Sequence, residues 1–317
     1  MLARYRGGQR LTQTFHRMGT VSVIIPAYSA AAYIAAALES VGAQSWQDWE
    51  ILVVEDGTAD GTDSIVKSFL DRWPNHRVEY IRHSRNQGVS AARNTAILAS
   101  RGEWLAFLDH DDIWMPHHLE NSVCLLIETV GDLCFCGVER FEQASTTREP
   151  YTTLDLKTGW IERLFLKNEI VLSSVVLRRT ALDSALFDPN PEVQHCEDYD
   201  LWLRLAEQRR KFVKVHQVGV LYRKHAVQAT SKSGMMLERE YNVLRRRQIS
   251  FPLAPALKRN RCSELCLRTA MFYWNTDVSK TRKYLWVALC LTPARPKLLW
   301  LWVKAKFAKT ACQTRRK

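Results

Sequence analysis

Short apolar runs alternate with amphipathic stretches through the first third of the chain. The runs are rich in β-branched and aromatic residues and cover residues 21–26, 49–54, 77–81 and 104–108. Such runs are typical of strands buried on both faces of a parallel sheet. Apolar residues at helical spacing predict helices over 30–41, 62–72, 89–99 and 116–128. Repeated strand–helix units with short connections predict an α/β fold, a doubly wound, largely parallel sheet with helices on both faces.

The alternation becomes less regular after residue 112. We expect a strand over 133–138, a polar surface loop over 143–157, mixed short elements over 158–187, an amphipathic helix within 193–205 and a strand over 212–222. From about residue 235 the pattern predicts helices only. We therefore divide the chain into a basic leader (1–19), a catalytic α/β domain (20–232) and a basic, Trp-rich helical extension (233–317).

Polar clusters follow three of the predicted strands directly. They are Ala27-Tyr28-Ser29, Glu55-Asp56-Gly57 and Asp109-His110-Asp111-Asp112. Because the carboxyl ends of parallel strands meet at one edge of a sheet, we expect the three clusters to converge there. The sequence contains neither a G-x-G-x-x-G after the first strand nor a G-x-x-x-x-G-K-[ST], which disfavours a dinucleotide fold of that type and a P-loop enzyme.

The acidic turn 109–112 has two interpretations. Its three carboxylates repel one another unless a cation lies among them, and a hard divalent cation takes oxygen ligands and bridges to phosphates. Asp is also a favoured N-cap, so the turn could simply begin the helix predicted over 116–128.

The net charge of +12 is unevenly distributed. The leader has four Arg and no acid, residues 20–231 have 21 basic and 29 acidic residues, and residues 232–317 have 20 basic and four acidic residues. A basic, Trp-rich segment suits a helix at an anionic membrane surface or a contact with nucleic acid. It equally suits the solvated surface of a helical bundle packed on the catalytic domain.

The eight cysteines form no C-x-x-C pair, and the basic N-terminus is not followed by an apolar signal region. No run of about 18 uninterrupted apolar residues occurs, so a transmembrane helix is not predicted. We expect reduced thiols and a cytoplasmic protein, with peripheral association at the inner face of the membrane if the basic tail binds lipid.

Five motifs, in this order, closely resemble those of the family 2 inverting glycosyltransferases of the GT-A fold. They are Pro26-Ala27-Tyr28, Val54-Glu55-Asp56-Gly57-Thr58, Asn86 to Asn94, Leu108 to Trp114, and Glu197-Asp198-Tyr199-Asp200-Leu201-Trp202. The resemblance covers about residues 20–230. It implies transfer of a sugar from a nucleoside diphosphate sugar to a glycan or lipid-linked acceptor in polysaccharide and cell-envelope biosynthesis, with no nucleic acid partner.

The resemblance also implies a divalent metal, Mn²⁺ or Mg²⁺, that neutralises the diphosphate leaving group. Asp109 and Asp111 match the D-x-D positions, with Asp111 as the direct ligand and Asp109 facing the ribose or sugar. Asp112 is then left as the helix cap. His225 matches a late His that some enzymes of this fold supply to the metal or diphosphate, although a surface His is an equal alternative.

The donor site follows from the same motifs. Pro26, Ala27 and Tyr28 would form a wall against the nucleobase, and Glu55-Asp56 matches the place where a carboxylate accepts from the base N–H. Arg93 matches a residue near the diphosphate and the acidic turn, where a guanidinium pairs with phosphate or carboxylate. A structural salt bridge is its alternative role.

Asp198 matches the family's general base, which removes the proton of the acceptor hydroxyl. Glu197 would bind the acceptor or support Asp198. Trp202 is included as a substrate-binding candidate, although its place on an apolar helical face also suits the core. Asp198 as a simple helix cap is the alternative.

This sequence departs from the family pattern at two positions, with Ser29 where Asn is common and His110 where a small residue is usual. His110 would narrow the donor site. The sequence lacks the Q-x-x-R-W motif of processive synthases, which favours addition of one or a few sugars. A sugar nucleotidyltransferase would need a glycine-rich loop after the first strand, and a non-catalytic membrane or nucleic-acid adaptor would not need the acidic clusters.

Overall fold

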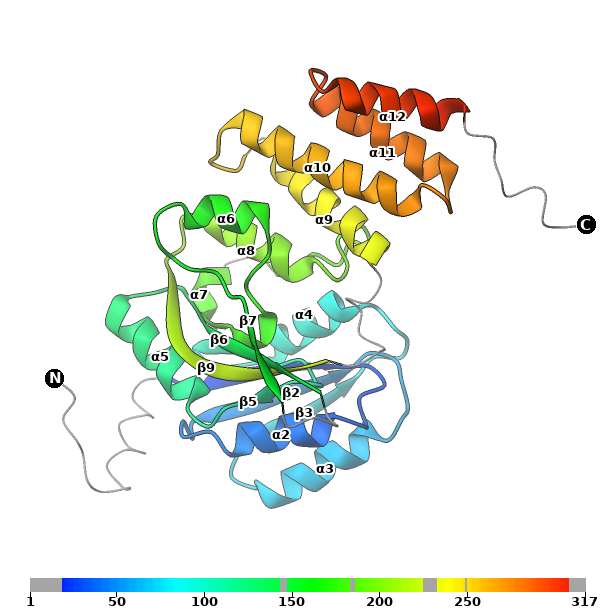
Figure 1. Ribbon diagram of the computed structural model, residues 1–317. Coiled ribbons are helices and arrows are strands. Elements are labelled where there is room, and N and C mark those ends of the chain that lie inside the picture. The colour runs from blue at the N-terminus through cyan, green and yellow to red at the C-terminus, as the bar shows by residue number, and fades with distance from the viewer. Residues whose placement is uncertain (1–18, 143–146, 183–185, 225–232, 249, 308–317) are drawn as a thin grey trace, which may run out of the picture. The chain divides into compact units, whose positions relative to one another are not determined.

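The computed structural model describes residues 19–142, 147–182, 186–224, 233–248 and 250–307 (Figure 1). The chain forms two compact units. The first unit contains residues up to Pro189 together with Arg204–Ala226, and the second contains Asn190–Leu203 and the residues from Val227 onward. The predicted leader lies outside the described residues except for Gly19.

The first unit is built on a nine-stranded sheet with the order β3-β2-β1-β4-β8-β6-β9-β5, and β7 pairs with β6. The strands are β1 (Val21–Ala27), β2 (Trp49–Glu55), β3 (Val78–Arg82), β4 (Trp104–Phe107), β5 (Ile113–Trp114), β6 (Leu133–Phe141), β7 (Arg148–Tyr151), β8 (Val176–Arg178) and β9 (Phe212–Arg223). The helices of this unit are α2 (Ile34–Gly42), α3 (Thr62–Arg72), α4 (Val89–Ala99), α5 (His118–Thr129), α6 (Trp160–Leu166), the 3₁₀ helix η1 (Leu172–Ser174) and α7 (Arg179–Leu182).

The first four strands confirm the predicted parallel half of the sheet. β1 pairs in parallel with β2 and with β4, and β2 pairs in parallel with β3. The other half is mixed, because β8 is antiparallel to both β4 and β6, β5 is antiparallel to β9, and β9 runs parallel to β6. The sheet is therefore largely parallel, as predicted. The segment 143–157 was predicted to be a surface loop, but it contains the strand β7, which pairs antiparallel with β6.

Helices cover both faces of the sheet, and alternate side chains of each buried strand point to opposite faces. Val23, Ile25 and Ile51 belong to the apolar core that also contains residues of α2, α3 and α5. Ile24 and Leu52 point to the other face and are equally buried. Figure 1 shows α2 and α3 on one side of the sheet and α4 on the other. Strands buried on both faces explain why their sequences are continuously apolar.

A β-bulge interrupts the regular pairing of β6 with β9. The register shifts on both sides of Gly137, which pairs with Val218 after Cys136 has paired with Val215. Gly137 is required at this point because a Cβ would lie 2.9 Å from the carbonyl oxygen of Gln217. Close to the bulge, Nδ1 of the buried His118 lies 3.5 Å from Sγ of Cys136.

The second unit contains the first part of α8 (Glu197–Glu207) and the helices α9 (Ser233–Arg247), α10 (Pro255–Tyr273), α11 (Val278–Leu291) and α12 (Pro296–Phe307). Its core includes Leu244, Leu265 and Leu285. Arg261 and Asp200 are buried with it and each has a partly exposed partner: Arg261 donates to Glu240 at 2.6 Å, and Arg247 pairs with Asp200 at 3.2 Å. Among the described helices, none is both long enough and apolar enough to cross a membrane.

Burial of His118 predicts an acid-sensitive contribution to stability. Burial lowers the pKa of His118 from 6.5 to about 3. Between these values the unfolded chain binds a proton that the folded protein excludes, so stability falls as the pH drops below about 6.5, by up to about 1.4 kcal/mol per pH unit. Urea unfolding between pH 7 and pH 4.5 should therefore show a shallower loss of stability for His118→Leu than for the unaltered protein.

The exposed neighbour His117 provides the matched control. His117→Asn should change the pH dependence of the unfolding free energy less than His118→Leu does. Identical pH dependence in His118→Leu and the unaltered protein would show that His118 is not held neutral by the fold.

Candidate active site

The carboxyl ends of β1, β2 and β4 bring the three polar clusters together, as the sequence predicts. Ala27 pairs with Glu55 across β1 and β2, and Ile24 pairs with Phe107 across β1 and β4. The N–H of Asp56 donates to the carbonyl of Ala27 at 2.8 Å. Nδ1 of His110 donates to the carbonyl of Pro26 at 3.2 Å, so the side chain at this unusual position ties the acidic turn to the loop after β1.

Asp109 is held by a buried arginine. Arg93, on α4, is only 4% exposed, and its Nη2 donates to Oδ1 of Asp109 at 2.8 Å. The guanidinium also lies over the ring of Phe187, 5.4 Å from its centroid. The Asp109 side chain is 32% exposed, so a ligand can reach it at the edge of the sheet. The buried guanidinium of Arg93 compensates its negative charge.

Asp112 is not the helix cap that the sequence suggested. α5 begins at His118, and the residue at its N-cap position is His117. Asp112 is instead buried, with Oδ2 accepting from Oγ of Ser173 at 2.6 Å and Oδ1 accepting from the N–H of Arg223 at 3.0 Å. Burial, with the nearby charges of Asp111 and Asp109, raises the pKa of this carboxyl well above its usual value.

Ser173 and Arg223 complete the support of the turn, and sequence reasoning missed both. Oγ of Ser173 accepts from the N–H of Asp109 at 3.1 Å while donating to Asp112. Nε of Arg223 donates to the carbonyl of Asp111 at 2.8 Å. The Arg223 guanidinium lies over the rings of Tyr33 and Phe141, at 5.0 and 4.5 Å. The sequence offered one signal for each residue. Ser173 is a polar residue inside an apolar run, and Arg223 is a charged residue at the end of a strand.

Glu55 and Asp56 are buried and bonded within the protein. Glu55 accepts from Oγ1 of Thr58 at 2.7 Å and from the hydroxyl of Tyr80. Burial, together with this second bond, raises the pKa of Tyr80. Asp56 contacts Nδ1 of His83 at 2.8 Å.

Asp56 also fixes the loop that leads into α4. Its carboxylate accepts from the N–H groups of Gln87 at 2.8 Å and Gly88 at 2.7 Å. Since Arg93 follows one turn later on α4, the second acidic cluster helps to place the arginine that holds the first.

The loop after β1 offers one open aromatic side chain. Pro26 and Ala27 are buried in the strand, whereas Tyr28 is 53% exposed. Ser29, the other departure from the family pattern, adopts a φ of 50°. Of the three residues predicted to wall the nucleobase, Tyr28 therefore presents the most surface to a ligand.

The E-D motif lies in the second unit. Glu197 and Asp198 occupy the first turn of α8; Glu197 is buried, and Asp198 is partly exposed and accepts from the N–H of Tyr199 at 2.7 Å. Trp202 has no exposed surface, so in this structure it is a core residue and presents no face to a sugar. His225 lies outside the described residues.

The donor set at the acidic turn fits a hard divalent cation. Asp109 and Asp111 supply carboxylate oxygens at the sheet edge, and Mg²⁺-type sites use one or two carboxylates with water and substrate phosphates. Across the described parts of the chain, no three His, Cys, Asp or Glu side chains gather into a complete metal cage.

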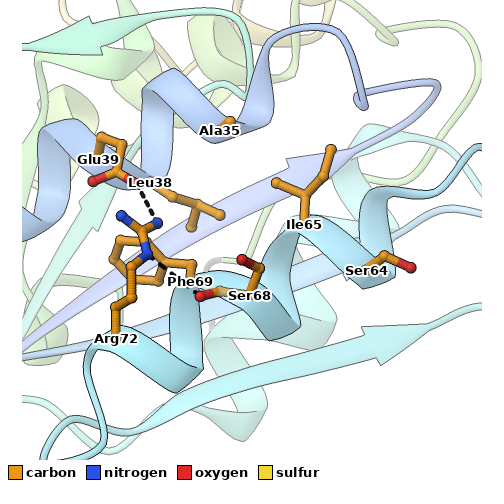
Figure 2. Close-up of a pocket in the computed structure, with 8 residues that line it drawn as sticks. All are labelled: Ala35, Leu38, Glu39, Ser64, Ile65, Ser68, Phe69 and Arg72. Carbon is orange, nitrogen blue, oxygen red and sulfur yellow. Dashed lines mark hydrogen bonds and ion pairs between the residues drawn. The ribbon is translucent and has the colours of Figure 1, made fainter.

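A separate groove lies between α2 and α3 and has a volume of about 280 Å³. It is lined by Ala35, Leu38, Glu39, Ser64, Ile65, Ser68, Phe69 and Arg72. Figure 2 shows Arg72 and Glu39 paired across it. Because helix surfaces rather than strand ends form this groove, and because its single acid is paired, we do not assign the donor to it.

The clamp on the acidic turn predicts a difference between two adjacent buried serines. Ser173→Ala removes bonds to both Asp109 and Asp112 and should cost about 1–3 kcal/mol of unfolding free energy. Ser174 makes only a local bond, to the carbonyl of Val171 at 2.6 Å, so Ser174→Ala should cost about 1 kcal/mol or less. Urea unfolding measures both, and an equal or smaller cost for Ser173→Ala would contradict the clamp.

Comparison with known proteins identifies the family of the chain. Residues 22–184 match the model of the family described as glycosyl transferase family 2. The Escherichia coli protein WfgD, a UDP-Glc:alpha-D-GlcNAc-diphosphoundecaprenol beta-1,3-glucosyltransferase, is 30% identical over 228 residues, which cover 71% of this chain and 85% of WfgD.

Solved structures share the fold at low sequence identity. Staphylococcus aureus TarS 1–349, in complex with UDP-GlcNAc, superposes with a TM-score of 0.67 at 17% identity, covering 90% of each chain. The mannosyltransferase PcManGT of Pyrobaculum calidifontis, in complex with GDP-Man and Mn²⁺, gives a TM-score of 0.57 at 15% identity, covering 94% of this chain and 86% of PcManGT. The fold is thus GT-A, and the chain belongs to glycosyl transferase family 2.

Proposed function

We propose that this glycosyltransferase transfers a hexose from a nucleoside diphosphate sugar to a hydroxyl of a lipid-linked glycan, with inversion and with metal assistance. The observation that carries the proposal is the acidic turn after β4. Its Asp109 is paired with the buried Arg93, and its backbone is fastened by Ser173 and Arg223. Such a fixed pair of carboxylates, Asp109 and Asp111, at the carboxyl edge of a parallel sheet suits a metal-bound diphosphate.

The donor would lie across the ends of β1, β2 and β4. Tyr28 offers an exposed ring for the nucleobase, and Asp56 keeps the neighbouring loop in place. A bound Mn²⁺ or Mg²⁺ would neutralise charge on the departing diphosphate. Arg93 holds Asp109 in orientation, and Asp111 is the second oxygen donor of the turn. The UDP-glucose named for WfgD supports UDP as the first nucleotide to test.

Asp198 is the proposed general base. It would accept the proton of the acceptor hydroxyl as that oxygen forms its bond to the anomeric carbon and the bond to the diphosphate breaks. Attack from the face opposite the leaving group inverts the anomeric configuration. The position of Asp198 on the first turn of α8 favours negative charge there, and its partial exposure leaves the carboxylate reachable.

The acceptor proposed is a sugar carried on a lipid diphosphate, and the site adds one sugar to it. The name of WfgD specifies an acceptor of this kind, GlcNAc-diphosphoundecaprenol. A lipid-linked acceptor would place the reaction at a membrane surface, in the assembly of a cell-envelope polysaccharide. Family membership disfavours the sugar nucleotidyltransferase and the non-catalytic adaptor as alternatives.

Replacement of the proposed base should separate chemistry from donor binding. In Asp198→Asn the amide cannot accept the proton, so transfer should fall by a factor of about 10² or more. Binding of UDP measured by calorimetry should be unchanged. Glu207→Gln, at the other end of the same helix, is the control and should keep its activity. Turnover of Asp198→Asn close to that of the unaltered protein would exclude Asp198 as the base.

Replacement of Asp111 tests the metal site. Asp111→Asn removes one negative ligand, so UDP affinity in the presence of Mn²⁺ should fall about tenfold or more, equivalent to at least ~1.4 kcal/mol. Binding measured with EDTA should be the same in both proteins. The exposed Asp71 of α3 gives the control Asp71→Asn. Unchanged Mn²⁺-dependent affinity in Asp111→Asn would argue against a metal at this turn.

A further inference from the structure

The last two helices of the second unit contain no acidic residue. From Val278 to Lys317 the sequence has no Asp or Glu, while Lys and Arg recur throughout. The described basic side chains here include Lys283 on α11 and Lys297 and Lys304 on α12, all of which are exposed. This part of the unit therefore carries a positive surface that no acid of its own two helices balances.

α12 is apolar on two sides. Its inner side buries Leu298, Leu301 and Ala305. Its outer side exposes Leu299, Trp300 and Val303, which are 50%, 59% and 40% accessible. Leu299 and Trp300 precede Val303 by four and three residues, the spacings that bring side chains together on one side of a helix. The outer side of a surface helix is ordinarily polar, so this apolar strip requires an explanation.

α11 extends the strip. Trp286 is 51% exposed, and its ring lies 5.3 Å from that of Trp302 on α12, which brings the outer sides of the two helices together. The ammonium of Lys304 lies 5.1 Å from the centroid of the Trp300 ring. We call these exposed side chains of α11 and α12 the aromatic-basic face: Trp286, Leu299, Trp300 and Val303 with Lys283, Lys297 and Lys304.

The chemistry of this face selects its partner. A second copy of the chain in a twofold contact would bring lysines against lysines, because each copy presents the same patch. A nucleic acid would meet the lysines but would leave Leu299 and Val303 unmatched, since phosphate does not bind aliphatic side chains. An anionic lipid surface suits both the basic and the apolar side chains. Its head groups attract the lysines, and the Trp, Leu and Val side chains enter the boundary between head groups and acyl chains.

We propose that the aromatic-basic face of α11 and α12 docks the enzyme on an anionic lipid bilayer. Trp286, Leu299, Trp300 and Val303 enter the interface between head groups and acyl chains, and the lysines contact lipid phosphates. Docking holds the enzyme at the surface that presents a lipid-linked acceptor. That purpose rests on the proposed function, whereas the binding itself requires no acceptor and no donor.

Vesicle sedimentation of the full chain, without substrates, tests the proposal. The unaltered protein should sediment with vesicles of equimolar phosphatidylglycerol and phosphatidylcholine, and weakly or not at all with phosphatidylcholine alone. The double variant Leu299→Ser/Trp300→Ser should lower the partition coefficient about tenfold or more. Leu98→Ser removes a 75% exposed leucine of α4 and should bind as the unaltered protein does. The charge variant Lys297→Gln/Lys304→Gln should weaken binding and reduce its dependence on salt.

Several outcomes would overturn the proposal. They are absence of binding by the unaltered protein, equal binding by the Leu299→Ser/Trp300→Ser variant, and equal losses in that variant and in Leu98→Ser. A self-association that light scattering detects in the unaltered protein and not in the variant would assign the face to a second copy instead. Matching circular dichroism melting curves would confirm that the variant is folded.

A second assay separates this proposal from the proposed function. Transfer to a detergent-dispersed lipid-linked acceptor should proceed at the same rate in the unaltered protein and in Leu299→Ser/Trp300→Ser, because the bilayer is absent. Lack of transfer by both proteins, with vesicle binding intact, would reject the proposed reaction and leave the docking face standing. Loss of transfer in the variant alone would place the face in the catalytic machinery and overturn its assignment to membrane docking.

Discussion

Three carboxylates within four residues at the end of β4 repel one another, and the surrounding structure is arranged to contain that repulsion. Asp109 is compensated by Arg93 from α4. Asp112 is withdrawn from solvent and bonded to Ser173 and to the backbone of Arg223. Once these two are held by the protein, Asp111 is the acid whose position is fixed through its backbone carbonyl, by Arg223. The turn is thus fastened by contacts within the protein itself, as suits the charged leaving group that we propose for it.

The supports of this turn come from distant parts of the chain, which ties the site to the fold. Arg93 is placed by α4, whose preceding loop is fixed by Asp56 at the end of β2. Ser173 lies in the 3₁₀ helix before β8, and Arg223 ends β9. The antiparallel entry of β8 beside β4 brings Ser173 to the acidic turn, and the long β9 carries Arg223 back to the same edge. The mixed half of the sheet therefore serves the site as much as the parallel half does.

The local sequence pattern predicted those helices and strands whose signals lie within the segment itself. The helices over 62–72 and 89–99 were found at their observed bounds, and the first four strands to within one residue at their ends, because apolar periodicity and breakers mark them. The clustering of Tyr28, Asp56 and Asp109 followed from parallel topology alone. Ser173 and Arg223 could not be found in this way, since their partners are 61 and 111 residues away from them. The prediction that Asp112 caps a helix was wrong because it rested on the neighbouring residues in the sequence. The partners of Asp112 in the fold, Ser173 and Arg223, are distant in the sequence.

The central claim is inverting transfer at a metal-assisted site, and the anomeric configuration of the product tests it most directly. The full chain is incubated with UDP-glucose, Mn²⁺ and a detergent-dispersed GlcNAc-diphosphate lipid, and the product is examined by proton NMR. The account predicts one β-linked glucose per acceptor from the α-linked donor, with release of UDP, and loss of product when EDTA removes the metal. An α-linked product, or β-linked product at an undiminished rate in EDTA, would contradict it.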